Sequence, residues 1–339
     1  MTDCLGAAKT AEKEDFMKIF DLHNDAPSLF VRLSEDEIKN GLDEIMTKYY
    51  RTDNLCGAVF SVFVGNCEVF SGKARESAFR QIDITKKLIN ESGKFVLAGG
   101  NDGAEKILNE GKIPVILSLE GAEPIDSPER LEEFREAGIS FLSLTWSRDN
   151  AYAGGCRLSR ISGEKGLTSK GKELLAEAER LGVYVDLAHA GRKTAREILE
   201  NFSGRVLISH TNCRALNDLD RNADDEVIAE VVWRGGVVGA SGVSMLCGCG
   251  KAELAEHILR TLELGNGKGA ALGLDISDTR VYYGRNDSYR IDGKTVEAFD
   301  VIRNYDDGDS LACVLSERGL SGKTIAEVVF GNAVGFFSK

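Results

Sequence analysis

The sequence predicts an α/β protein built on a (β/α)₈ TIM-type barrel, and three observations lead to this fold class. The chain has 339 residues, a length at which α/β barrels fold as one domain with inserted loops. Short, almost wholly apolar runs alternate with amphipathic segments along the chain, which is the pattern of parallel strands joined by helices. Eight such units follow one another, and this number favours a closed barrel over an open doubly wound sheet.

The predicted strands are the near-continuous apolar runs that parallel strands require when both of their faces are buried. The eight runs of the barrel are 16–22, 57–64, 113–119, 139–144, 183–187, 206–209, 237–242 and 270–274. A shorter run over 95–98 predicts an extra short strand outside this set.

Several of the predicted helices carry clear end signals. One begins with Ser127 as its N-cap and Pro128 in its first turn, and it ends at Gly138. Two apolar stripes, over 174–181 and 227–232, are each followed by glycine. Strand–helix alternation at this spacing indicates parallel βαβ units.

No low-complexity linker divides the chain, so we predict one barrel over 16–339 with an N-terminal tail over 1–15. The tail lacks the apolar core of a signal peptide, and no apolar run approaches the roughly 18 residues of a membrane span. We therefore expect a cytoplasmic protein.

Charge and cysteine usage narrow the range of partners. The chain has 42 Lys+Arg against 54 Asp+Glu, a formal charge of −12, which argues against nucleic acid or an anionic membrane as a partner. Its 8 cysteines form no CxxC pair, so we interpret them as free thiols. Cys247 and Cys249 could bind a soft metal as a pair, but two sulfurs are a weak signal and we interpret them as structural.

The histidines are the most informative residues. There are 4 in the chain, and three of them, His23, His189 and His210, stand at the ends of predicted strands. Reactive residues of such barrels lie at the carboxyl ends of the strands. Residues two apart on a strand point the same way, so Asp25 would join His23 on one ion. The fourth, His257, lies on a helical stripe and is interpreted as a packing or solvent-facing residue.

Two carboxylates follow other strands. Glu120 ends the strand that begins at 113, and Asp275 ends the strand that begins at 270. A buried charge needs a partner or a metal ion. Together with the histidines and Asp25, these side chains can hold two divalent metal ions and leave one carboxylate over. Nitrogen and oxygen ligands favour Zn²⁺, with Mn²⁺ or Co²⁺ as alternatives.

These residues and their surroundings resemble the renal (membrane) dipeptidase family of zinc dipeptidases, within the amidohydrolase-like metal-dependent barrels. The resemblance extends from about residue 18 to 337, and its motifs are DLHND, SLEGAEP, SLTWSRDNAYAGG, VDLAHAG, SHTNCRAL with DRN, GLDISD and FGNAVGFF. It implies a metal-dependent peptidase that cleaves small dipeptides, with L-Xaa-D-Xaa dipeptides among the candidate substrates. Family members are often dimers, so the resemblance allows a homodimer.

The resemblance also implies a set of metal ligands. By this likeness His23 and Asp25 bind one metal ion, His189 and His210 bind the second, and Glu120 bridges both.

Two further roles follow from the same likeness. Asp275 matches the catalytic acid/base, and Arg221 matches the arginine that holds the carboxylate of the substrate. The chemistry is coherent, because two close metal ions lower the pKa of a water molecule between them and polarise the scissile carbonyl. A planar guanidinium suits a bidentate carboxylate.

The sequence departs from the family pattern around the substrate. Trp146 stands where many members have a histidine near the substrate carbonyl, so we place Trp146 among the substrate-binding residues. The segment SGVSMLCGCG after the seventh strand lacks the tyrosine of the family. We therefore predict a rebuilt substrate pocket and keep two alternatives, a binuclear amidase or lactonase and a ligand-binding barrel without catalysis. The retained Asp275 speaks against the second alternative.

Overall fold

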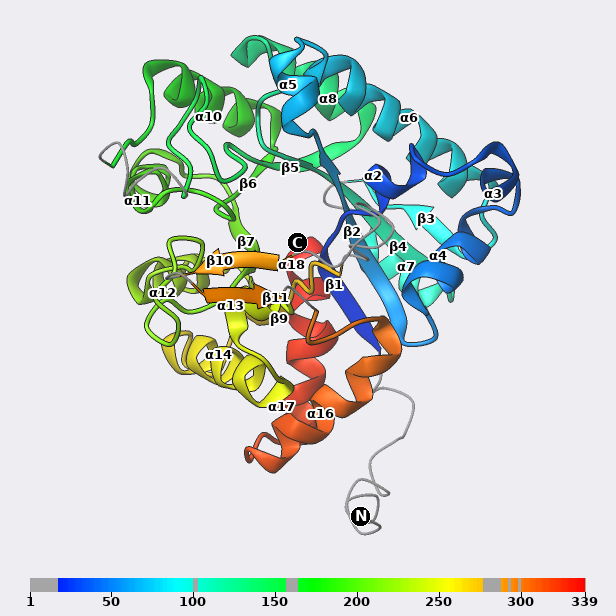
Figure 1. Cartoon of the computed structure of the whole chain (residues 1–339), viewed down its shortest axis with the longest axis vertical. Coiled ribbons are helices and arrows are strands. Elements are labelled where there is room, and N and C mark those ends of the chain that lie inside the picture. Colours follow the sequence, from blue (N-terminus) through cyan, green and yellow to red (C-terminus); the bar gives the residue numbers. More distant parts are fainter. Residues whose placement is uncertain are drawn as a thin grey trace.

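Eight parallel strands close into a barrel with helices around its outside (Figure 1). The computed structural model describes residues 18–99, 103–156, 164–276, 288–291, 294–297 and 300–338. The predicted tail over 1–15 lies outside the described residues, as do the first two residues of the run over 16–22.

The barrel strands lie close to the eight predicted runs. They are β1 (Ile19–Asn24), β2 (Leu55–Phe63), β4 (Ile113–Glu120), β5 (Ile139–Ser143), β6 (Tyr184–Asp186), β7 (Val206–Thr211), β8 (Val238–Ala240) and β9 (Ala270–Leu272). Each pairs in parallel with its neighbour, β2 pairs with β4, and the pairing of Asp21 with Leu272 closes the barrel between β1 and β9. The predicted fold class is confirmed.

The extra strand is confirmed as well. It is β3 (Phe95–Leu97), which pairs in parallel with residues 113–115 at the start of β4. Since the later part of β4, from Leu117, pairs with β5, β3 extends the sheet only at the amino end of the barrel and leaves the carboxyl end unchanged.

The helices between and after these strands have the following bounds: α2 (Ala26–Phe30), α3 (Glu35–Lys39), α4 (Leu42–Tyr50), α5 (Asn66–Phe70), α6 (Ala74–Glu91), α7 (Ala104–Asn109), α8 (Leu131–Ala137), α10 (Ser169–Leu181), α11 (Arg192–Asn201), α12 (Asp225–Trp233), α13 (Ser244–Cys247), α14 (Lys251–Leu264), α16 (Gly308–Glu317), α17 (Gly322–Ala326) and α18 (Asn332–Phe337). Pro128–Arg130 and Tyr305–Asp307 form short 3₁₀ turns, and Glu327–Gly331 forms a π-helical turn.

Two of the predicted helix ends are confirmed, and one predicted start is confirmed in position but not in its side-chain capping bond. Gly138 and Gly182 follow α8 and α10 with φ of 113° and 64°, a conformation that glycine adopts at little cost. Ser127 is the N-cap of the 3₁₀ turn Pro128–Arg130, which leads directly into α8, and Pro128 lies in the first turn as predicted. The side chain of Ser127 makes no capping bond to a backbone N–H, and its hydroxyl donates to Oε2 of Glu129 at 2.6 Å.

The C-terminal helix closes the amino end of the barrel. Phe337 of α18 stacks on Phe20 of β1 and Phe141 of β5, with ring centroids 5.8 and 6.1 Å apart. Phe336 meets Tyr184 at the start of β6, and Asn332 donates to the carbonyl of the first residue of β9. The apolar barrel interior and α18 thus form one buried cluster, and the opposite, carboxyl end is left for polar side chains.

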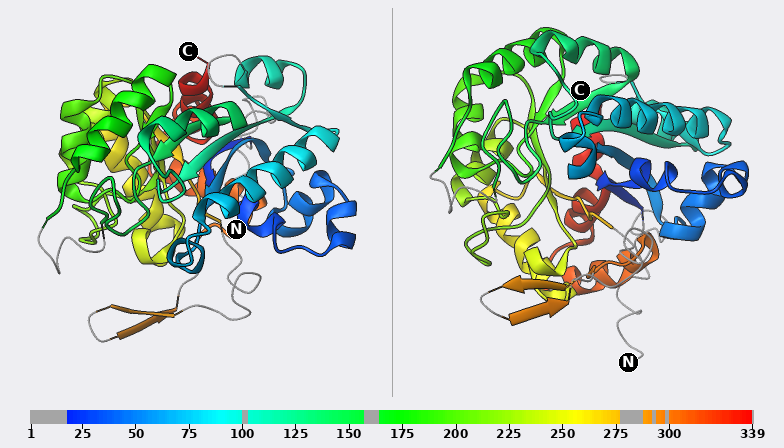
Figure 2. Two further views of the ribbon diagram at one scale, coloured as in Figure 1. Left: turned by 90° about the horizontal axis from the view of Figure 1, so that it is seen from above. Right: turned by 45° about the horizontal axis from the view of Figure 1, so that its top comes forward.

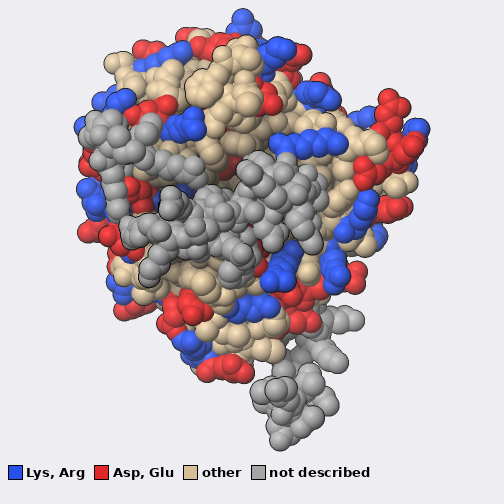
Figure 3. All heavy atoms as spheres, in the orientation of Figure 1, with Lys and Arg blue, Asp and Glu red and all other residues tan. Residues whose placement is uncertain are grey.

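The antiparallel hairpin of β10 (Ser288–Ile291) and β11 (Lys294–Glu297) projects on the side opposite the C-terminus (Figure 2). Basic and acidic side chains are interspersed over the described part of the face in Figure 3. Among the described residues, no helix is long and apolar enough to cross a membrane.

Candidate metal centre

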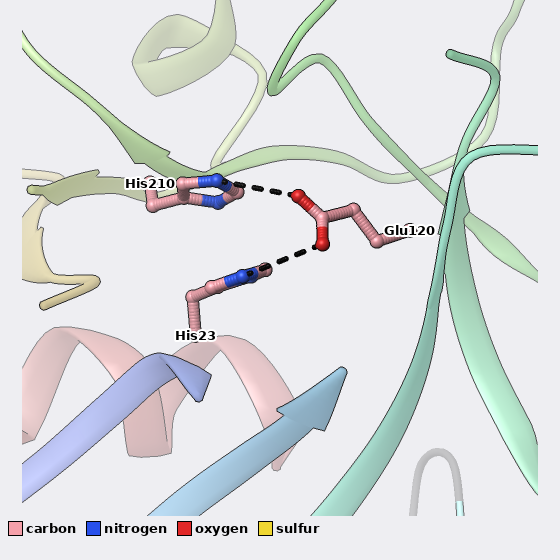
Figure 4. Close-up of side chains that lie close together, drawn as sticks. All are labelled: His23, Glu120 and His210. Atoms are coloured by element: carbon pink, nitrogen blue, oxygen red, sulfur yellow. Dashed lines mark ion pairs between the residues drawn. The ribbon is translucent and has the colours of Figure 1, made fainter. Parts of the chain in front are cut away.

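The carboxyl ends of the strands bring the predicted metal ligands together. His23 lies in β1, His210 lies in β7, and Glu120 is the last residue of β4. Figure 4 shows the carboxylate of Glu120 beside the two imidazole rings, with one oxygen toward each ring. His189 lies in the loop after β6, and Asp275 lies just beyond β9.

A first group of donor atoms surrounds Nε2 of His23. This nitrogen lies 3.5 Å from Oδ1 of Asp25, 3.8 Å from Oε2 of Glu120 and 3.9 Å from Oδ1 of Asp275. It is buried and makes no hydrogen bond to any residue that the structure describes. A buried nitrogen without a hydrogen bond is costly, and a cation among these oxygens would satisfy it.

A second group surrounds the other oxygen of Glu120. Oε1 lies 2.8 Å from Nε2 of His189 and 3.6 Å from Nε2 of His210. The two Nε2 atoms are 3.0 Å apart. Three buried donor atoms therefore converge on one point, with the ring of His23 stacked on the ring of His210 at a centroid distance of 3.6 Å.

Both groups fit a divalent metal ion. Tetrahedral ligands at roughly 2.0–2.2 Å from a zinc ion lie about 3.3–3.6 Å from one another. The distances from Nε2 of His23 to the three oxygens and those within the second group run from 2.8 to 3.9 Å and include this range. The donor atoms are imidazole nitrogens and carboxylate oxygens, which suit zinc, manganese and cobalt. Each group therefore has the spacing and chemistry to hold one ion.

Serine hydroxyls hold the other ring nitrogen of each histidine. Nδ1 of His23 lies 3.0 Å from Oγ of Ser61, and Nδ1 of His189 lies 2.7 Å from Oγ of Ser147. In the same way Nδ1 of His210 lies 2.8 Å from the hydroxyl of the preceding serine. All three rings are thus turned so that Nε2 faces the carboxylates. The roles of these serines are not predictable from the sequence, because a serine in an apolar run carries no distinguishing pattern.

Two of the candidate site residues have left-handed backbone. His189 has φ of 64° and Asp275 has φ of 55°, a region that costs a residue other than glycine roughly 1–2 kcal/mol. The chain at Asp275 is held by a hydrogen bond from its backbone N–H to the carbonyl of His23 at 3.3 Å. Backbone strain of this kind concentrates at functional sites, and here it occurs at two residues whose side chains face the cluster.

Burial and neighbouring charges shift the pKa values in the cluster. Burial raises the pKa of Asp275 to about 7 and raises the pKa of Glu120 well above its usual range. Burial lowers the pKa of His23, but the charges of Glu120, Asp25 and Asp275 outweigh it and raise the pKa to about 10. For His210, burial and the charge of His23 lower the pKa. The cluster therefore favours positive charge at the position that fits a cation.

Asp25 reaches the cluster by a different path from the predicted one. His23 and Asp25 were expected two apart on one strand, but β1 ends at Asn24 and Asp25 is the N-cap of α2. The chain turns here because Oδ1 of Asn24 accepts a hydrogen bond from the backbone N–H of Ala26 at 2.8 Å. The two side chains still converge, since Asp25 turns toward His23 from the start of the helix.

Arg221 faces the same cluster from the loop between β7 and α12. Its Nη2 donates to the carbonyl oxygen of His210 at 3.0 Å. Burial is the main influence that raises the pKa of Glu120 and of Asp275, and the charge of Arg221 opposes it at both. The side-chain amide of Asn222 ties the loop down by donating to two backbone carbonyls.

Trp146 forms part of an apolar wall beside the second group. It follows β5, and its ring centroid lies 5.9 Å from that of His189 and 5.0 Å from that of Phe63, the last residue of β2. Trp146 and Phe63 are both half-buried. Phe63 is not recognisable as a site residue from the sequence, because a phenylalanine that ends an apolar strand has the pattern of a core residue.

The residues that were interpreted as structural pack accordingly. His257 of α14 is buried, and its Nδ1 accepts a hydrogen bond from the backbone N–H of Cys213 at 3.0 Å, so its interpretation as a packing residue is confirmed. Cys247 is buried, Cys249 is exposed, and both are free thiols. The seven cysteines that the structure describes are all free, and Cys4 lies outside the described residues.

The closed barrel and the buried imidazole–carboxylate cluster at its carboxyl end are features of metal-dependent hydrolases. The sequence profile of the membrane dipeptidase family (peptidase family M19) matches residues 10–259. The chain belongs to this family, and the predicted assignment to the metallo-dipeptidases is confirmed.

Individual relatives agree with this assignment. An uncharacterised dipeptidase of Schizosaccharomyces pombe is 28% identical over 288 residues, which cover 76% of this chain and 68% of the relative. Dipeptidase 3 of Mus musculus is 28% identical over 229 residues, which cover 65% of this chain and 46% of the relative. The chain thus matches about half the length of the mouse protein.

Solved structures show the same fold. A metallopeptidase from Rhodobacter sphaeroides, liganded with a phosphinate mimic of the dipeptide L-Ala-D-Ala, has a TM-score of 0.79 at 19% identity, over 95% of this chain and 98% of that chain. An amidohydrolase from Pseudomonas aeruginosa has a TM-score of 0.75 at 20% identity, over 95% of this chain and 96% of that chain.

Proposed function

We propose that this protein hydrolyses the peptide bond of small dipeptides at a centre of two divalent metal ions, with Zn²⁺ as the first candidate. The observation that carries the proposal is the place of Glu120, whose Oε2 belongs to one group of donor atoms and whose Oε1 belongs to the other. A carboxylate in this position can bridge two ions. Membership of the dipeptidase family supports the reaction class.

The ligands divide between the two ions in this proposal. His23 and Asp25 hold the first ion, His189 and His210 hold the second, and Glu120 contributes one oxygen to each. When bound, two such ions supply a water molecule of lowered pKa and polarise the carbonyl oxygen of the substrate. The serine hydroxyls on the Nδ1 atoms orient the three imidazoles.

Asp275 moves the proton. Its carboxylate lies at the edge of the cluster, where 23% of the side chain is exposed, so it can reach both the cluster and a bound substrate. Burial raises the pKa of this carboxyl above its usual range, and a carboxylate at this place can accept a proton from water and return it to the leaving group. In this role it takes the proton of the attacking water and gives it to the leaving amine.

Arg221 and the apolar wall bind the substrate. The guanidinium of Arg221 is half-buried beside His210 and offers a planar fork to the C-terminal carboxylate of a dipeptide. Trp146 and Phe63 present aromatic rings next to His189, where an apolar side chain of the substrate would be buried. Trp146 cannot be protonated, so we assign it binding and not acid catalysis.

A reconstitution screen tests the proposal. The purified chain is stripped of metal, loaded with Zn²⁺, Mn²⁺ or Co²⁺, analysed for metal content and assayed on L,L and L,D dipeptides. L-Ala-D-Ala is included because the structurally similar Rhodobacter metallopeptidase binds a mimic of it. We expect two ions per chain and turnover of dipeptides. Less than one ion per chain, together with no hydrolysis under any loading, would overturn the proposal.

An amidase or lactonase is the second candidate. The segment after β8 favours it, because 241–250 contains no tyrosine to meet a dipeptide amine. Turnover of N-acyl amides or lactones, with no dipeptide hydrolysed by the same metal-loaded sample, would replace the first proposal with this one. The cytoplasmic location and the homodimer stay predictions, which cell fractionation and light scattering test.

A further inference from the structure

His210 differs from the other two histidines of the cluster, because the serine at its Nδ1 is itself bound by a buried carboxylate. Oγ of Ser209 lies 2.8 Å from Nδ1 of His210 and donates to Oδ2 of Asp186 at 2.5 Å. Asp186 is the last residue of β6, and Ser209 lies in the neighbouring strand β7. The exposed fractions of the three residues are 1% for His210, 0% for Ser209 and 4% for Asp186, so water does not compete for these bonds.

The carboxylate of Asp186 is the acceptor in each of its hydrogen bonds that the structure describes. Its Oδ1 accepts from the backbone N–H of Ala188 and from the backbone N–H of Ser209, each at 2.9 Å. Its Oδ2 accepts from the Ser209 hydroxyl. In the part of the chain that the structure describes, no lysine or arginine pairs with Asp186. Asp186 therefore acts as a hydrogen-bond acceptor in this position and not as a partner in an ion pair.

We infer that Asp186, acting through Ser209, fixes the tautomer of His210 so that Nε2 presents its lone pair to a metal ion. A hydroxyl has one proton to give, and Ser209 gives it to Asp186. Oγ of Ser209 can then only accept from Nδ1 of His210, which must carry the ring proton. Nε2 is left without a proton, on the side of Glu120. The inference rests on the metal centre proposed above, and it makes Asp186 and Ser209 positioning residues.

Asp21 offers a matched contrast. Its Oδ1 also accepts from two backbone N–H groups, those of His23 and Leu274, and its Oδ2 accepts from the hydroxyl of Tyr305 at 2.8 Å. That hydroxyl accepts in turn from the amide of Asn24 and reaches no imidazole. Asp21 is therefore as buried as Asp186 and also accepts from two backbone N–H groups. It is not linked through a hydroxyl to a ring nitrogen, as Asp186 is linked through Ser209 to His210; we call this second arrangement the relay.

The contrast defines the variants. Asp186→Asn keeps the size of the side chain but turns it so that its NH₂ group donates to Ser209, whose proton then goes to Nδ1 of His210 and forces the ring proton onto Nε2. Ser209→Ala breaks the relay and retains the backbone bonds to Asp186. Asp21→Asn is the control, since it disturbs an equally buried carboxylate without touching the relay.

Two measurements test the relay in the full chain. Competition with a chromophoric chelator gives the affinity for Zn²⁺, and we expect Asp186→Asn and Ser209→Ala to weaken one of the two zinc sites by about 10–100-fold. Imidazole ¹⁵N correlation spectra of the zinc-free chain, which has 4 histidines to assign, show which nitrogen carries the proton. We expect Nδ1–H at His210 in the wild type and in Asp21→Asn, and Nε2–H in Asp186→Asn.

The outcomes separate the inference from the proposed function. A wild type that binds two zinc ions, with both sites and the Nδ1–H signal unchanged in Asp186→Asn and Ser209→Ala, overturns the inference alone. A wild type that binds no zinc overturns the proposed metal centre and the inference with it. Because a relay acts as a unit, the double variant should lose no more affinity than the worse single variant. If Asp186→Asn does not fold, Ser209→Ala alone decides, since zinc affinity equal to that of the wild type refutes the relay.

Discussion

Asp275 borders both the cluster and the space that a substrate would enter, so its substitution separates proton transfer from metal binding. In Asp275→Asn the amide cannot accept the proton of the attacking water, and we expect kcat to fall by about 10²–10⁴-fold. Metal content should stay near that of the wild type, because the five proposed ligands are unchanged. Metal analysis beside steady-state kinetics checks this, with Asp25→Asn as the variant that should lose metal. A parallel loss of metal in Asp275→Asn would make Asp275 a ligand and not the acid/base.

Arg221 gives a second prediction at the level of one side chain. Arg221→Met removes a charge-assisted hydrogen bond of roughly 1.5–3 kcal/mol, so KM for a dipeptide should rise by about 10–100-fold while kcat changes less. A dipeptide amide lacks the carboxylate and provides the comparison substrate. Wild type and variant should hydrolyse the amide equally well. An equal loss on both substrates would show that Arg221 supports the site through the carbonyl of His210 and does not read the carboxylate.

The residues of the site divide into those that the sequence could reveal and those that it could not. His23, Glu120 and His210 were predictable because polar side chains at the ends of apolar strands are unusual. Ser209 and Asp186 were not, because their role depends on which strands are neighbours and on which way each hydroxyl proton points. Local pattern carries neither kind of information.

The C-terminal helix α18 gives a prediction at the level of an element. Phe337 stacks on Phe20 and Phe141 inside the amino end of the barrel and is 1% exposed. Phe337→Ala should lower the free energy of unfolding by about 3–5 kcal/mol, measured by urea denaturation. The folded fraction should keep the kcat/KM of the wild type, because the metal cluster lies at the other end. Phe70→Ala is the control, since Phe70 of α5 is 78% exposed and its loss should leave stability nearly unchanged.

The strand ends show where sequence patterns stop being informative at this scale. The apolar run over 270–274 predicts a strand that is longer than the observed β9. The strand ends at Leu272, because the backbone N–H of Leu274 donates to Oδ1 of Asp21 and not to a neighbouring strand. In β6 the carboxylate of Asp186 does the same for Ala188. Because these two backbone N–H groups are bonded to side-chain carboxylates, the chain can leave the strand and take left-handed backbone at Asp275 and His189. Long-range acceptors, and not the local run of apolar residues, set these ends.

For the whole molecule, the barrel brings three carboxylates and three imidazoles into one cluster whose imidazoles and central Glu120 are buried, so folding and metal binding should be coupled. Any ligand that binds only the native state stabilises it, by about 4 kcal/mol at a thousand times its Kd. For a chain of 339 residues that corresponds to a rise of roughly 5–10 °C in Tm. We therefore expect a chelator to lower Tm by this amount and added Zn²⁺ to restore it, as measured by calorimetry. Glu120→Gln should lose most of the zinc-dependent rise because Glu120 lies in both donor groups, whereas Phe70→Ala should keep it. If chelation leaves the Tm of the wild type unchanged, then the native barrel does not bind the ion, and the cluster must be held together by its shared protons alone.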